Sequence, residues 1–236
     1  MDKSINLSEV KKFSDMASKW WDYKGPLKTL HDINHYRVKY IVDKLRARSS
    51  INGLEILDVG CGGGLVCEPL SRLRASVTGI DASKENIKIA SEHAKLCDLD
   101  IKYQESTIEL HLKKNKKYDC IVCLEVLEHV DNVNEFISSC CKALKKGGVL
   151  FFSTINRNLK SYLTSIVVAE YVLRWLPTGT HDWQKFLKPS EVVCALEKEG
   201  VIVQEMKGLK FEPISSKNWA LSDDIDVNYI LYAIKE

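Results

Sequence analysis

Apolar positions along the chain follow two spacings, and these divide it into helical and strand-like segments. Over residues 8–21 apolar side chains recur every three or four positions, which predicts an amphipathic helix, and residues 30–48 form a second helical stretch. Beyond residue 50, short strand-like runs, most of them apolar, alternate with helical stretches; the runs cover residues 55–59, 76–81, 101–104, 118–124 and 149–154. This alternation is typical of right-handed β–α–β units in a parallel sheet.

One segment departs from this alternation. Residues 161–176 are almost wholly apolar, with Glu170 and Arg174 as their only charges. A membrane-spanning helix needs about 20 residues, so this stretch is too short to cross a bilayer. It follows the fifth apolar run, on the side of such a sheet where ligands bind. Two interpretations stay open: an active-site lid or buried helix, and a patch that rests on a membrane surface.

Composition limits the classes of partner. The chain has 236 residues, 45% of them hydrophobic, which is enough for one domain with a sizeable core. With 34 basic and 32 acidic side chains the formal charge is +2, and this balance gives no reason to expect a nucleic-acid partner. The first residues lack the apolar segment of a secretory signal, and the eight cysteines lie in core-like contexts. We therefore expect reduced thiols in a cytoplasmic protein.

The first apolar run leads into a glycine-rich turn. Asp58 and Val59 are followed by the sequence Gly60-Cys61-Gly62-Gly63-Gly64, and helical sequence begins at Leu65. This order predicts a buried strand, a tight turn and a helix start, and glycine would let a flat cofactor approach the main-chain N–H groups closely. A dinucleotide-binding turn requires glycine or alanine where Leu65 stands. The spacing therefore argues against a nicotinamide-dependent oxidoreductase, which we keep as an alternative.

The second apolar run ends in an acid. Asp81 follows Gly60 by about 20 residues, the distance at which an acidic residue binds the ribose of a nucleotide in related α/β folds. A carboxylate there can accept hydrogen bonds from two ribose hydroxyls. The competing interpretation is that Asp81 only caps the helix that begins near Ser83. Because the glycine turn and the acid occur together in this order, the ribose role is favoured.

Ionisable side chains follow the fourth run directly. In a helical turn Glu125, Glu128 and His129 would lie on one face. Two carboxylates and an imidazole could hold a divalent metal, or His129 could act alone as a general base. Magnesium prefers oxygen ligands, so an imidazole ligand suits zinc, manganese or iron better. A purely structural role is the third interpretation.

Several motifs together resemble a known family. The chain resembles the class I S-adenosylmethionine (SAM) methyltransferases in the motifs LDVGCGGG, VTGIDAS, YDCIVCLEVLEHV and LKKGGVLFFSTINRN. It resembles the O-methyltransferases of the ubiquinone pathway more closely, in the motifs FSDMASKWWD, LHDIN with Arg37, AEYVLRWLPTGTHDW and DVNY. The resemblance extends from Phe13 to Tyr232. It implies a doubly wound, Rossmann-like α/β fold with a seven-stranded, mostly parallel sheet, completed by strands near residues 201–209 and 227–234, the last one antiparallel.

We accordingly expect one SAM-dependent methyltransferase domain over residues 1–236. Its expected parts are a helical cap, a SAM-binding core, a lid or membrane-facing insert, and the C-terminal part of the sheet, at residues 1–50, 51–155, 156–188 and 189–236 respectively.

The resemblance also implies roles for individual residues. Arg37 is expected to contact SAM at its carboxylate, and Leu124 to pack beside the adenine. The expected cofactor-binding set is Arg37, Asp58, Gly60, Gly62, Asp81 and Leu124. Glu128 and His129 are the expected catalytic residues. Glu125, Glu128 and His129 are the candidate ligands of a divalent metal such as magnesium.

The implied activity is SAM-dependent O-methylation of phenol or catechol hydroxyls on polyprenylated intermediates of ubiquinone biosynthesis. The implied partners are this substrate, a membrane surface bound weakly at its inner face, and other enzymes of the pathway. The alternatives are methylation of a small soluble phenol or of a carbon centre on the same fold, and a protein that binds SAM without catalysis.

Overall fold

The apolar runs form the strands of one central sheet. In this computed structural model, which describes residues 6–163, 182–212 and 219–236, the first five strands are β1 (Glu55–Val59), β2 (Ser76–Asp81), β3 (Lys102–Glu105), β4 (Tyr118–Leu124) and β5 (Leu144–Ile155). They pair in parallel, and the strand order is β3-β2-β1-β4-β5-β8-β6-β7. The predicted doubly wound α/β fold is confirmed.

The C-terminal part of the sheet contains one strand more than expected. It consists of β6 (Val201–Phe211), β7 (Trp219–Ser222) and β8 (Asn228–Lys235), and β8 runs antiparallel to both β5 and β6 as predicted for the last strand. The sheet therefore has eight strands, and the prediction of seven is corrected. The extra strand, β7, pairs with the last four residues of β6. Four residues at a sheet edge are too few for a recognisable alternation of apolar and polar positions.

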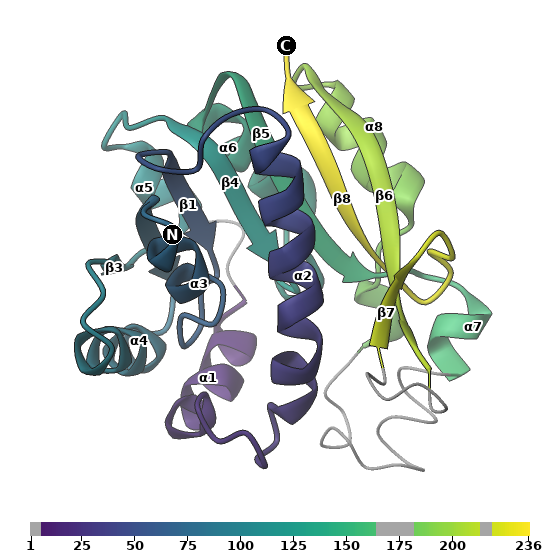
Figure 1. The fold of residues 1–236 in the computed structure, drawn as a ribbon. Coiled ribbons are helices and arrows are strands. Elements are labelled where there is room, and N and C mark those ends of the chain that lie inside the picture. Colours follow the sequence, from purple (N-terminus) through teal and green to yellow (C-terminus); the bar gives the residue numbers. More distant parts are fainter. Residues whose placement is uncertain (1–5, 164–181, 213–218) are drawn as a thin grey trace.

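Helices cover both faces of the sheet (Figure 1). The α-helices of the described residues are α1 (Leu7–Asp15), α2 (Lys28–Arg46), α3 (Cys67–Arg72), α4 (Lys84–Leu96), α5 (Ile108–Leu112), α6 (Val133–Ala143), α7 (Leu159–Ser161) and α8 (Pro189–Glu197). Neighbouring strand residues serve opposite faces: Ile56 packs in the core layer that includes α2 and α3, and Leu57 in the layer that includes α6 and α8. Burial on both sides explains why the central strands β1 and β4 are mostly apolar.

The first predicted helix is shorter than its apolar pattern. It ends at Asp15, and a 3₁₀ turn, η1 (Ala17–Lys19), leads to Trp20. The whole of α1 contains no buried residue, so it does not pack into the main core. Trp20 is buried instead, in a small cluster with Ala17, Leu27 and Leu65. The apolar spacing over residues 8–21 therefore continues through α1 and η1 to Trp20, whose ring lies against the glycine turn.

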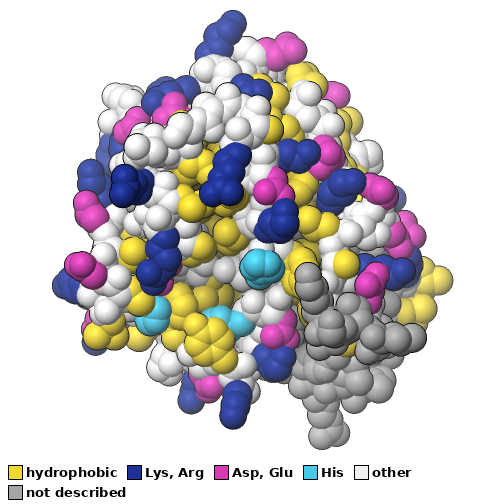
Figure 2. Space-filling model, viewed as in Figure 1, with side chains coloured by type: hydrophobic (Ala, Val, Ile, Leu, Met, Phe, Trp, Pro, Cys, Tyr) yellow, Lys and Arg dark blue, Asp and Glu magenta, His cyan; other side chains and the backbone are white. Residues whose placement is uncertain are grey.

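The surface seen in Figure 2 carries charges of both signs. Lysine and arginine side chains alternate there with aspartate and glutamate, and no patch of one sign dominates this face. None of the helices within the described residues is long and apolar enough to cross a membrane. Most of the predicted insert, residues 164–181, lies outside the part of the chain that the structure describes.

Candidate active site

The glycine turn after β1 has a backbone that other residues would strain. Gly60, Gly62 and Gly64 have φ angles of 72°, 52° and 91°, in the left-handed region. Space is also short, because a Cβ on Gly60 would lie 2.4 Å from Cγ2 of Val126 and one on Gly62 would lie 2.3 Å from the Trp20 ring. The N–H of Gly60 donates to the carbonyl of Ile80 on β2 at 2.8 Å, which ties the turn to the neighbouring strand.

Asp81 lies beside this turn at the end of β2. Its Oδ2 accepts a hydrogen bond from the Gly62 N–H at 2.9 Å, and its Oδ1 accepts from the Ser83 N–H at 2.8 Å and from Asn86 Nδ2 at 3.3 Å. Burial raises the pKa of Asp81, and these hydrogen bonds oppose that shift. The N-cap of α4 is Ser83, whose hydroxyl accepts from the Asn86 N–H. Asp81 is therefore not the helix cap itself, and its carboxylate borders the cavity.

Arg37 and Asp58 are buried charged residues that line the same cavity as Asp81. Both are 3% exposed, and Arg37 Nη1 lies 3.6 Å from Glu125 Oε1. Arg37 Nε has no hydrogen-bond partner among the described residues. Asp58 accepts a hydrogen bond from the Cys67 thiol at 3.1 Å, and burial raises its pKa to about 7, against the effects of this bond and of Arg37. A buried donor without a partner costs free energy, so Arg37 fits an anionic group of a ligand.

A cavity of about 380 Å³ connects these residues. It is bordered by the glycine turn, by the ends of β2 and β4, and by α1, which lies at the end of the sheet toward which β4 points (Figure 1). Every predicted site residue lines it, namely Arg37, Asp58, Gly60, Gly62, Asp81, Leu124, Glu125, Glu128 and His129. The structure thus brings together residues from four separate parts of the sequence.

The backbone after β4 differs from the expected helical turn. Glu125 has a φ of 55°, in the left-handed region, and only Leu127–His129 form a 3₁₀ turn, η2. The Glu125 N–H still donates to the carbonyl of Ser153 on β5 at 3.1 Å, so the residue continues the strand before the chain turns. The prediction that Glu125, Glu128 and His129 share one helix face is therefore wrong.

Glu125 and Glu128 nevertheless form a carboxyl pair. Glu125 accepts a hydrogen bond from the Ser153 hydroxyl at 2.6 Å, and Glu128 accepts one from the Thr154 hydroxyl at 2.8 Å. Glu128 is 3% exposed, and its burial and the neighbouring charge of Glu125 raise its pKa well above the usual range. The two carboxyl groups are thus close enough for the charge of Glu125 to act on Glu128. Two like charges this close favour sharing a proton or a cation.

His129 is oriented by a residue that the sequence did not indicate. Its Nδ1 lies 2.9 Å from Glu9 Oε2. Its ring centroid lies 5.0 Å from that of Phe13, and the two rings are in a T-shaped arrangement. Burial alone would raise the pKa of Glu9, but His129, together with nearby lysines, lowers it. Glu9 lies on α1, 120 residues earlier in the chain, and a single glutamate on a helix carries no spacing signal that could have predicted this contact.

The candidate metal ligands fit a cation in part. The Glu125–Glu128 pair offers the oxygen ligands that a hard divalent cation prefers, and a cation would relieve the repulsion between the two carboxylates. His129 faces Glu9 instead. The ligand atoms of Glu125, Glu128 and His129 do not all lie within 4.8 Å of one another. The carboxyl pair therefore suits a cation, whereas a three-ligand set with His129 is absent from the described residues.

Comparisons with known proteins agree with this geometry. A family described as "Methyltransferase domain" matches residues 32–201. Proteins named ubiquinone biosynthesis O-methyltransferase from Rickettsia typhi and Pelagibacter ubique are 47% and 46% identical to this chain, over 99% and 98% of it and over 94% and 99% of their own lengths.

A solved structure shows the same fold. The magnesium protoporphyrin IX methyltransferase of Synechocystis PCC 6803, with bound SAH, superposes with a TM-score of 0.69 at 19% identity, covering 97% of this chain and all of its own. At that identity the likeness concerns the fold alone. The full-length sequence similarity and the matching domain are decisive, and the chain belongs to the methyltransferase family, within the group of the ubiquinone biosynthesis O-methyltransferases.

Proposed function

We propose that the protein transfers the methyl group of SAM to a phenol or catechol hydroxyl of a polyprenylated ring intermediate in ubiquinone biosynthesis. The observation that carries the proposal is one cavity that joins the glycine turn and Asp81 to the ionisable residues after β4. The names of the full-length relatives supply the substrate class.

The cofactor half of the cavity suits SAM. Asp81, which borders the cavity, can accept hydrogen bonds from the ribose hydroxyls, and the glycine turn allows close contact with the backbone. Arg37 offers a buried donor to the carboxylate of SAM. Leu124 provides an apolar wall at the end of β4, where an adenine would pack. SAM has no phosphate, so the large side chain of Leu65 after the turn is no obstacle.

The other half suits the activation of a phenol. Methyl transfer from a sulfonium is an in-line displacement that depends on alignment of the oxygen, the methyl carbon and the sulfur. A phenol with a pKa near 10 is mostly neutral at pH 7, so a base must remove its proton. Glu9 can accept a hydrogen bond from Nδ1–H of His129, which makes Nε2 the basic nitrogen. His129 is then the base, and Glu9 holds its tautomer.

A divalent cation held by Glu125 and Glu128 would supply a Lewis acid that lowers the pKa of the phenol. Within the chain itself, Ser153 and Thr154 fix the two carboxyl groups through their hydroxyl hydrogen bonds. The pair is therefore held in place from β5 whether it shares a proton or a cation.

A direct assay tests the proposal. The protein is incubated with SAM carrying a radiolabelled methyl group and a short-prenyl catechol, and label in the organic extract is counted. We expect transfer to the catechol oxygen. SAM binding without transfer would favour a non-catalytic protein, and equal use of an unprenylated phenol would favour the alternative substrate class.

The substrate class also bears on membrane contact. Each CH₂ group kept from water contributes about 0.8 kcal/mol, so a long prenyl chain stays in the bilayer and the enzyme has to meet it there. Exposed apolar side chains flank the segment outside the described residues: Leu159, Tyr162 and Leu163 before it and Trp183 after it. They support a weak, peripheral contact with the inner face of the membrane.

A further inference from the structure

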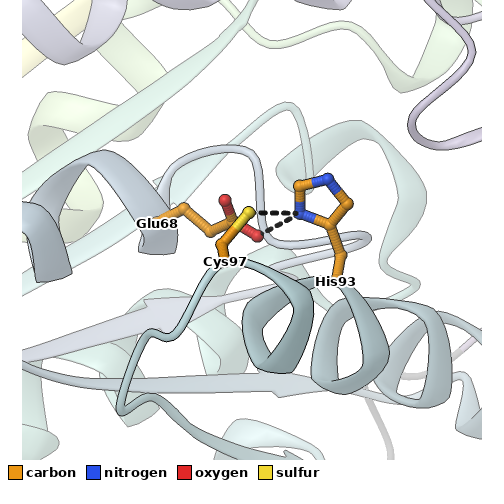
Figure 3. A group of neighbouring side chains, drawn as sticks. All are labelled: Glu68, His93 and Cys97. Atoms are coloured by element: carbon orange, nitrogen blue, oxygen red, sulfur yellow. Dashed lines mark hydrogen bonds and ion pairs between the residues drawn. The ribbon is translucent and has the colours of Figure 1, made fainter.

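Three side chains of types that bind metals meet between α3 and α4 (Figure 3). Glu68 comes from α3, and His93 and Cys97 come from α4 and its C-cap, four residues apart on one face. His93 Nδ1 lies 2.5 Å from Glu68 Oε1 and 3.8 Å from Cys97 Sγ. One ligand atom from each lies within 4.8 Å of the others. Both contacts converge on Nδ1 (Figure 3), so one ring nitrogen faces the two other side chains.

Neighbouring contacts hold this arrangement in place. Glu68 is 4% exposed, and Arg72 Nη2 lies 3.8 Å from its second oxygen, which leaves Oε1 directed at His93. The indole of Trp21 stacks on the His93 ring with centroids 3.4 Å apart and an angle of 5°. The carboxylate and the imidazole are thus already oriented, as the groups around a metal site usually orient its ligands. His93 and Cys97 are only partly buried, so an ion can reach the cluster from solvent.

We propose that Glu68, His93 and Cys97 bind a zinc ion. A carboxylate oxygen, an imidazole nitrogen and a thiolate sulfur together suit Zn²⁺, whereas Mg²⁺ and Ca²⁺ prefer oxygen ligands only. Zinc often takes three protein ligands and a water molecule in tetrahedral geometry. The carboxylate and the thiolate carry two negative charges, which balance the charge of the ion.

The binding step needs small changes. Tetrahedral zinc places ligand atoms about 3.3–3.6 Å apart, so the Glu68 carboxylate moves about 1 Å away from His93. Cys97 gives up its thiol proton to solvent, and the proton of the His93 ring resides on Nε2, so that Nδ1 can bind the metal. The hydrogen bond between Glu68 and His93 is replaced by two bonds to zinc.

The ion would also act on the cofactor turn. Trp21 stacks on His93, and its Nε1 donates a hydrogen bond to the Gly63 carbonyl at 3.1 Å. A metal that fixes His93 therefore fixes the indole that rests on the glycine turn. We expect zinc to raise the melting temperature of the protein. This inference does not depend on the proposed methyl transfer.

Cobalt substitution tests the site in the full chain. Co²⁺ bound by a thiolate gives a charge-transfer band in the near ultraviolet, and we expect this band to saturate at one equivalent. Cys97→Ser should abolish it, and Cys194→Ser, which changes an exposed cysteine on α8, should leave it intact. Zinc affinity, measured by competition with a chromophoric chelator, should fall about 100-fold or more in His93→Gln.

Other results would overturn the assignment. Absence of the band in the wild type, its persistence in Cys97→Ser, or equal zinc affinity in His93→Gln would each exclude this site. Circular dichroism of both variants shows whether they are folded, and Glu68→Gln, which keeps the shape of the side chain, provides a second test of affinity if either is not. Cys97→Ser retains the Glu125–Glu128 pair, so cobalt that binds this variant without the band reports that pair instead.

Discussion

At the scale of single residues, the cavity depends on a few buried charges whose partners are only partly supplied by the protein. Asp81 already accepts three hydrogen bonds, Asp58 accepts one from a thiol, and Arg37 has an unpartnered Nε. Charged groups buried in this way cost free energy that a matching ligand recovers. They are therefore where substitutions should separate ligand binding from folding.

Asp81→Ala should weaken SAM binding while the protein stays folded. Each charge-assisted hydrogen bond to a ribose hydroxyl contributes about 1.5–3 kcal/mol, so the loss of two raises the dissociation constant about 100-fold or more. Calorimetry measures the constant directly. Asp100→Ala, which removes an exposed aspartate, is the matched control. An unchanged constant for Asp81→Ala would defeat the ribose assignment.

Asp58 should make the stability of the protein depend on pH. Burial raises its pKa from 3.8 to about 7, so between these values the folded state binds the proton more tightly than the unfolded state. The protonated form of Asp58 therefore contributes to the free energy of unfolding at low pH. This contribution, on the order of a few kcal/mol, is lost as the pH rises through about 7. Urea unfolding of Asp58→Asn at pH 5, 6, 7 and 8 should therefore show a smaller decline than the wild type. Parallel pH profiles would contradict this.

Glu9→Gln should lower kcat with little change in the KM for SAM. The amide keeps the size of the side chain but removes the charge that favours Nδ1–H on His129, and we expect a loss of about 10- to 100-fold. Asp15→Asn, on the exposed side of the same helix, is the control. A rise of that size in the KM for SAM, without loss of kcat, would show that Glu9 only supports the N-terminal helical cap.

Chelation should separate the carboxyl pair from the base. If a cation sits on Glu125 and Glu128, a chelator lowers the transfer rate about 10-fold or more and an added divalent cation restores it, while SAM affinity is unchanged. Running the assay in Cys97→Ser removes the proposed zinc site from the result. A rate that is insensitive to chelator would leave His129 as the sole activating group.

At the scale of elements, long periodic segments were predictable and short or distant ones were not. The central parallel strands are mostly apolar because both of their faces are buried, and this made their positions in the sequence recognisable. The strand β7 was missed because four edge residues carry little pattern. The turn after β4 was misjudged because a left-handed residue, Glu125, interrupts it, and residues other than glycine rarely adopt that conformation.

The candidate site shows the same division. Its cofactor side follows one local motif and one acid at a fixed spacing, so the sequence was sufficient to indicate it. The contact between Glu9 and His129, and the cluster of Glu68, His93 and Cys97, arise only when elements far apart in the chain pack together. No periodicity or spacing encodes such contacts.

At the scale of the whole molecule, the charge distribution favours a weak form of the proposed membrane contact over firm insertion. The formal charge is only +2, and the charges of both signs on the face in Figure 2 are interspersed, so attraction to anionic lipid is slight. Exposed apolar side chains flank the segment outside the described residues, and Leu159 is 71% exposed. These side chains would add some area that is buried on contact with the membrane. Binding should therefore be reversible.

The final prediction tests this contact by moving charge into it. Leu173 and Trp175 belong to the apolar segment of the sequence, outside the described residues, and changing both to aspartate should abolish co-sedimentation with anionic vesicles. Use of a long-prenyl substrate should be lost with it, because that substrate stays in the bilayer, while a short-prenyl catechol is still methylated. Leu96→Asp combined with Leu110→Asp, at exposed leucines on α4 and α5, controls for added charge alone. Co-sedimentation equal to that of the wild type would show that the segment serves the active site rather than the membrane.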